Sequence, residues 1–291
     1  MSVKKLVAAA LLAGSVLAVS APAQAVTTSF ANFNTLSSGS NIYWKNGNGS
    51  NTSTSGQIYT INSSSSTAAG TTIVNFNFLV GGLPQGVRAE FTLFGITSPA
   101  SAALQVGNCP GVACFLIQAN IAGTFSFLAK AASGGSQTVG AYTIPDGTNL
   151  LSTSNYTGAL LAGVKGGSSA AFDGTDPAGG TISYSSDAMF GLDFTSTTAR
   201  DFAITLGSLG QASATQVGFN AKDANGQYIG GPTAALSTFR ASANGTFGSE
   251  PSPSVPEPAT WALFVAGFGM VGFQVRRRRQ LASVAGYGWF G

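Results

Sequence analysis

The sequence predicts an all-β fold, an antiparallel β-sandwich or jelly-roll-like domain, followed by a C-terminal transmembrane helix. Three observations predict the β domain: short segments alternate apolar and polar residues, glycine-rich turns separate them, and no long amphipathic helix occurs between residues 26 and 255. Alternation with a period of two places one row of side chains in a core and the other in solvent. Many short strands joined by such turns are typical of sandwiches and jelly rolls.

Individual strands can be assigned from this alternation. It is clearest over 87–94, 121–127, 190–194 and 202–206. The segment 81–86, Gly-Gly-Leu-Pro-Gln-Gly, predicts a hairpin turn that joins strands over 71–80 and 87–96. The chain has 20 phenylalanines, and we expect them to supply much of the core.

The body of the chain carries little charge. Charged residues make up 8% of the sequence, against about 25% in a typical domain. Between residues 26 and 255 there are 7 basic and 9 acidic residues, a balance of −2. This balance excludes the basic patch that nucleic-acid binding requires.

Histidine is absent from the sequence. Its absence removes the commonest general base, the commonest metal ligand and any Ser-His-Asp triad. The sequence therefore predicts a protein that is not an enzyme and that needs no cofactor.

Residues 1–25 have the pattern of a secretory signal peptide. Lys4 and Lys5 form a basic start, residues 6–19 are apolar, and Ala23 and Ala25 provide the small side chains that signal peptidase requires. We expect the chain to be exported and cleaved, so that the mature protein begins near residue 26. An uncleaved N-terminal anchor is the alternative.

The C-terminal end begins with a proline-rich linker over 250–258, which we expect to be extended and semi-rigid. The next 17 residues, 259–275, carry no charge, and a helix of that length reaches about 25 Å, the short limit of a membrane span. The basic cluster of Arg276, Arg277, Arg278 and Arg279 follows directly, as on the cytoplasmic side of a span. We therefore predict a transmembrane helix rather than a buried core helix.

This segment resembles the PEP-CTERM sorting signal. The resemblance rests on Pro256, Glu257 and Pro258, on the apolar stretch that opens with Trp261 and Ala262, and on the arginine cluster, in that order. It implies that an exosortase-like membrane enzyme reads the motif and supplies the catalytic residues. It also implies transient anchoring in the inner membrane, then delivery to the cell surface or outside the cell, in bacteria that make exopolysaccharide and biofilms. The tail over 280–291 departs from the family, whose members usually end soon after the arginines.

Two cysteines flank a turn. Cys109 and Cys114 enclose Pro-Gly-Val-Ala, so the thiols can meet, and disulfides persist in exported proteins. We expect a disulfide, with redox catalysis or metal binding as the alternatives.

Two other groups of residues are candidate ligand contacts. Tyr43 and Trp44, beside Lys45 and Asn46, would suit a sugar, although a core strand over 42–44 explains them better. Asp173 and Asp176 could offer oxygens to Ca²⁺, with Asp187 or Asp193 joining them. Asp-Gly and Asp-Pro are also ordinary turn sequences, and we expect no metal.

Taken together, residues 26–249 are predicted to form a secreted, non-catalytic domain of the cell surface or extracellular matrix, associated with exopolysaccharide. A carbohydrate-binding module is the alternative. A hydrolase is disfavoured by the absence of histidine, and no sequence context points to the two facing carboxylates that sugar hydrolysis uses.

Overall fold

The computed structural model describes residues 28–36, 39–48, 52–106, 114–176, 181–194, 199–211, 218–222 and 235–250. The chain divides into two compact units, 1–250 and 251–291, and all described residues belong to the first. The elements are β1 (Thr28–Thr35), β2 (Ile42–Asn46), β3 (Gly56–Thr60), β4 (Thr72–Phe78), β5 (Gln85–Thr97), β6 (Leu104–Val106), β7 (Phe115–Ala129), β8 (Ser136–Val139), β9 (Tyr142–Pro145), β10 (Asn149–Val164), β11 (Ala170–Asp176), β12 (Ile182–Ser185), the 3₁₀ helix η1 (Ala188–Phe190), β13 (Arg200–Gln211), β14 (Ala221–Lys222), β15 (Ala235–Leu236) and β16 (Phe239–Ser249).

Most strands join one 12-stranded antiparallel sheet. Its hydrogen bonding runs from β1 through β4, β5, β7, β10, β11 and β13 to β16, and β16 pairs back onto β1. The sheet therefore closes on itself. The short strands β2 and β3 bridge β16 and β5 beyond the ends of β1 and β4. The predicted all-β antiparallel fold is confirmed, although the strands of the closed ring, β2 and β3 apart, follow a meander rather than the Greek-key order of a jelly roll.

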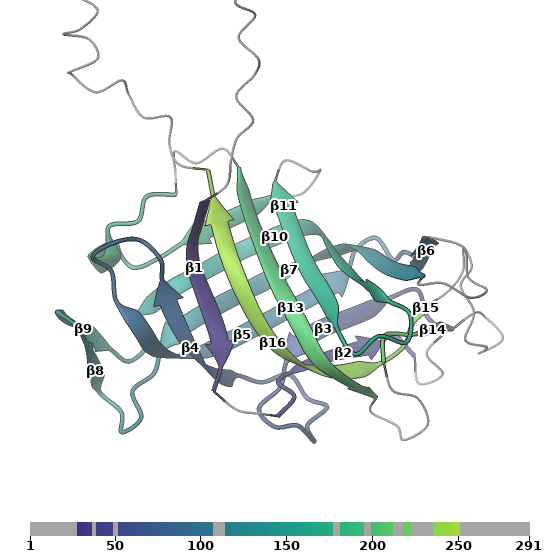
Figure 1. Ribbon diagram of the computed structural model, residues 1–291, viewed down its shortest axis with the longest axis horizontal. Helices are drawn as coiled ribbons and strands as arrows, with labels where there is room; N and C mark the ends of the chain where they lie inside the picture. Colours follow the sequence, from purple (N-terminus) through teal and green to yellow (C-terminus); the bar gives the residue numbers. More distant parts are fainter. Residues whose placement is uncertain are drawn as a thin grey trace, which may run out of the picture. The chain divides into compact units, whose positions relative to one another are not determined.

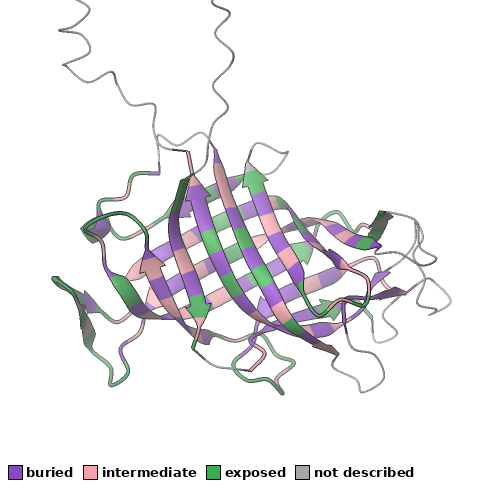
Figure 2. Ribbon diagram, in the orientation of Figure 1, coloured by how far each residue is buried: buried purple, intermediate pink, exposed green. Residues whose placement is uncertain are grey.

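The closed sheet is flattened into two layers whose strands cross at a steep angle (Figure 1). One layer contains β1, β16, β13 and β11, and the other contains β10, β7 and β5. Burial alternates along these strands, as Figure 2 shows, so each layer has one face in the core and one in solvent.

The core is largely aromatic, as the sequence predicted. Phe91 and Phe127 stack with ring centroids 4.5 Å apart and planes 5° from parallel. Phe33 packs on both rings, and most of the largest fully buried side chains are phenylalanines. Since aromatic side chains bury the most area per residue, they stabilise a domain with few charges.

The predicted hairpin is confirmed, because β4 and β5 pair from Thr72↔Phe91 to Asn77↔Gln85. The strands predicted over 87–94, 121–127 and 202–206 lie within β5, β7 and β13.

The strand predicted over 190–194 is wrong. The Asp187 side chain accepts a hydrogen bond from the Met189 backbone N–H at 3.0 Å and starts η1. Gly191, with φ 62°, then ends it. Phe190 and Phe194 are buried, but they reach the core from a helical turn and an irregular segment.

Candidate ligand cleft beside β12

A cleft lies where the sheet divides. One edge of β10 pairs with β11 over Leu160–Gly163 and with β12 over Ser152–Tyr156. β11 pairs with β13 and so continues the sheet. Among the described residues, β12 pairs with β10 alone. The space beside β12 is a cleft of about 340 Å³, lined by Ser183, Tyr184, Ser185, Ser186, Leu192, Asp193, Phe194 and Arg200.

Arg200 fixes the two walls of this cleft. Its guanidinium donates hydrogen bonds to the carbonyl oxygens of Ile182, at 2.7 Å, and Phe194, at 2.6 Å. The Tyr184 hydroxyl donates to the carbonyl oxygen of Asp201, which ties β12 to the start of β13. The cleft is therefore held open by charge-assisted and buried hydrogen bonds rather than by a strand ladder.

The floor of the cleft is apolar and its rim carries hydroxyl groups. Tyr184 and Phe194 meet edge to face with ring centroids 5.6 Å apart. Ser183 and Ser185 are exposed and share hydrogen bonds with Ser154 and Ser152, each at 2.9 Å. A small apolar surface with a few fixed polar groups is typical of sites for small polar molecules.

The ionisable groups of the cleft are compatible with binding an uncharged, hydroxyl-rich compound. Burial, reinforced by the Asp201 charge, raises the pKa of Tyr184 despite the opposing effect of Arg200, so the phenol stays neutral and acts as a donor. Asp193 is the one carboxylate among the lining residues, whereas sugar hydrolysis uses two. The lining can hold a polyhydroxyl compound through hydroxyls and one carboxylate.

Tyr43 and Trp44 cannot contact a sugar in this structure. Trp44 is 1% exposed, its indole N–H donates to the Leu236 carbonyl oxygen at 3.2 Å, and its ring lies against Gly56. Tyr43 is 6% exposed and stands between the ring of Tyr59 and the Arg240 guanidinium. Both residues belong to β2, so the core-strand interpretation describes them and the sugar-contact interpretation does not.

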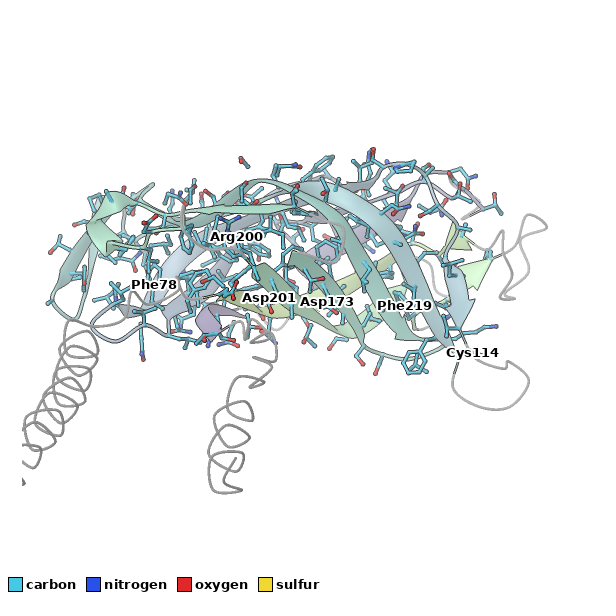
Figure 3. The ribbon with its side chains drawn as sticks, turned by 90° about the horizontal axis from the view of Figure 1, so that it is seen from above. Phe78, Cys114, Asp173, Arg200, Asp201 and Phe219 are labelled. Carbon is cyan, nitrogen blue, oxygen red and sulfur yellow. The ribbon has the colours of Figure 1, made fainter. Side chains whose placement is uncertain are left out.

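The aspartates proposed for Ca²⁺ are not gathered into one site. Asp173 lies on β11 beside β13, whose Asp201 is its acidic neighbour (Figure 3). Burial and the Asp201 charge raise the pKa of Asp173. Asp187 caps η1 and Asp193 lines the cleft, and the Asp176 side chain is outside the described part. Within the described ranges, no three acidic, cysteine or histidine residues come together as metal ligands.

Cys114 is disulfide-bonded and lies at one end of the domain in Figure 3. The sequence has one other cysteine, Cys109, which is outside the described residues.

The residues predicted for export and sorting are also outside the described residues: Ala23, Ala25, Pro256, Glu257, Pro258, Trp261, Ala262 and Arg276 to Arg279. In the portion that the structure describes, no helix has the length and apolar character of a membrane span. The transmembrane helix over 259–275 stays a prediction.

Comparison with known proteins identifies one segment. The family model of the PEP-CTERM protein-sorting motif matches residues 254–279. No curated protein and no solved structure matches the chain. The chain therefore carries a PEP-CTERM sorting motif, which implies export, transient membrane anchoring and processing by an exosortase-like membrane enzyme.

Proposed function

We propose that this chain is a non-catalytic component of the cell surface or extracellular matrix, delivered by its sorting motif into exopolysaccharide or biofilm. The observation that carries the proposal is the motif at 254–279, and the signal peptide predicted over 1–25 agrees with it. The motif specifies a destination and leaves the activity to the domain.

The outer face of the domain supports a role among hydrated polymers. Amide and hydroxyl side chains cover the strands β1, β4 and β16, with Asn32, Asn77 and Thr246 opposite one another in register. The Asn77 amide donates to Asn32 Oδ1 at 2.7 Å. Such side chains both donate and accept hydrogen bonds without adding charge, so they suit a matrix of sugars and water.

The sorting step can be tested in the producing cell. Pro256, Glu257 and Pro258 are replaced together by alanine, and the mass and location of the mature protein are compared with those of a matched linker control, Pro251→Ala with Pro253→Ala. We expect the motif variant to stay at the membrane with its C-terminal segment attached, and the control to be processed. Unchanged mass and location of the motif variant would show that the motif is not read.

A carbohydrate-binding module is the second candidate, and the cleft beside β12 favours it. Its apolar floor and hydroxyl rim match the mixed character of a sugar ring. Asp193→Asn should weaken retention of the protein on the producer's own polysaccharide, whereas Asp146→Asn, on a different loop, should not. Equal retention of both variants would exclude this cleft as the binding site.

A further inference from the structure

Phe94 is an exposed aromatic residue on the outer face of β5. Its side chain is 40% exposed, while its neighbours Leu93 and Gly95 are buried. From inside the sheet, the Tyr156 hydroxyl donates to the Phe94 carbonyl oxygen at 3.0 Å. Tyr156 is fully buried, so the backbone that carries the exposed ring is anchored from the core.

Hydroxyl groups continue this face on one side of Phe94. Thr124 on β7 lies directly opposite Phe94. On β10, Ser154 follows the buried Thr153 and lies in the exposed row, within the irregularity between Thr153 and Tyr156. The Ser154 hydroxyl is 2.9 Å from that of Ser183 on β12, and all three hydroxyl side chains are exposed.

A second cleft continues the face on the other side. Ile96, 39% exposed, lies opposite Gln57 on β3, and Gln57 lies opposite Lys45 on β2. These three residues line a shallow cleft of about 210 Å³ together with Asn46, Gly47, Ser55 and Gly56. The Phe94 face, defined by Lys45, Gln57, Ile96, Phe94, Thr124 and Ser154, thus has members on five neighbouring strands, β2, β3, β5, β7 and β10.

We propose that the Phe94 face binds one extended, uncharged polysaccharide chain that runs across the strands, with a sugar ring resting on the Phe94 side chain. An aromatic ring offers an apolar surface to the face of a sugar, and flanking hydroxyls and amides bond its hydroxyl groups. From β2 to β10 the face crosses four strand spacings, about 19 Å at 4.8 Å each. That length suits a polymer better than a single sugar, and the inference rests on the proposed placement of the chain among exopolysaccharides.

Two other classes of partner fit the Phe94 face less well. A protein partner requires a larger apolar core, whereas Phe94 and Ile96 are the two large exposed apolar side chains of this set. A nucleic acid requires several cations, and Lys45 is the one cation among the six residues that define the face.

The test is retention of the full-length chain, purified in detergent, on immobilised uncharged β-glucan and on the producer's own polysaccharide, with soluble oligosaccharides as competitors. Phe94→Ala should weaken retention about tenfold, and Phe94→Tyr should restore it. Leu36→Ala is the matched control, because Leu36 is 54% exposed and lies after β1, outside the Phe94 face. Circular dichroism melting checks that each variant is folded.

Longer oligosaccharides should compete better than monosaccharides, and 0.5 M salt should change retention less than twofold, because one lysine contributes little screened charge. Equal retention of Phe94→Ala and the parent chain, or a steep loss of retention in salt, would overturn the proposal. The location of the unmodified protein in the producing cell is measured separately, so a failure of the sorting proposal is distinguished from a failure of polysaccharide binding.

Discussion

The Arg200 guanidinium donates a hydrogen bond of 2.7 Å to the carbonyl oxygen of Ile182, across the gap where β12 and β13 form no ladder. A second hydrogen bond from the same group, of 2.6 Å, reaches the carbonyl oxygen of Phe194. A single side chain thereby substitutes for strand pairing at the edge of the candidate cleft.

Arg200→Met should destabilise the domain, because two carbonyl oxygens lose a charged donor. We expect the free energy of unfolding to fall by about 3 kcal/mol, the lower limit for two bonds that contribute about 1.5–3 kcal/mol each. Urea denaturation measures the change, and Lys45→Met, at an exposed position, is the control. A change for Arg200→Met that is no larger than that of the control would contradict this role.

Gly123→Ala should be more damaging than an ordinary strand substitution. A Cβ at this position would lie 1.9 Å from the Phe94 carbonyl oxygen and 2.7 Å from the Tyr156 hydroxyl. We expect a loss of about 3 kcal/mol, at the upper end of the usual cost of overpacking. Gly81→Ala, where no atom lies within 4 Å, should leave the melting temperature nearly unchanged.

Tyr156→Phe removes the hydroxyl that holds the Phe94 carbonyl. The aromatic packing remains, so the expected loss is that of one buried hydrogen bond, about 1–2 kcal/mol. Tyr142→Phe, on the β8–β9 hairpin, serves as the comparison in the same thermal melts. If the two variants had the same melting temperature, the hydrogen bond from Tyr156 to the Phe94 carbonyl oxygen would contribute no stability.

The pH dependence of stability should include a contribution from Asp173. Burial and the nearby Asp201 raise its pKa above the usual 3.8. In the window between that value and the raised one, the folded protein binds more protons than the unfolded chain, so stability falls as pH rises.

Asp173→Asn should therefore raise the melting temperature at pH 7 and have no such effect at pH 3. Asp201→Asn should move the Asp173 pKa back toward its usual value, which NMR titration can follow. An Asp173 pKa unaffected by the Asp201 substitution would contradict the coupling.

The sequence predicts those structural features that depend only on residues close together in the chain. The β4–β5 hairpin could be predicted because its turn and both alternating flanks are adjacent in the chain. The same alternation wrongly predicted a strand from Phe190 to Phe194. There the Asp187 cap and the left-handed conformation of Gly191 favour a short helix instead.

Features that join distant segments could not be predicted. Phe94 falls in the polar row of β5 with Arg88 and Thr92, as the alternation predicts, but only the folded sheet shows that Tyr59, opposite it on β3, is buried. The cleft arises because Arg200 meets β12 after folding. A sequence signal for it exists in the Ser183-Tyr184-Ser185 alternation, but that pattern alone predicts an ordinary strand.

The pairing of β1 with β16 sets a condition on the timing of assembly. Thr28 lies opposite Ser249, so the sheet cannot close until nearly the whole domain has crossed the membrane. Contacts between such distant segments slow folding. The sorting motif follows Ser249 by only a few residues, so β16 and the motif would reach the exterior almost together. In the proposed route, completion of the fold would come just before release from the membrane, and a chain truncated within β16 would lose both.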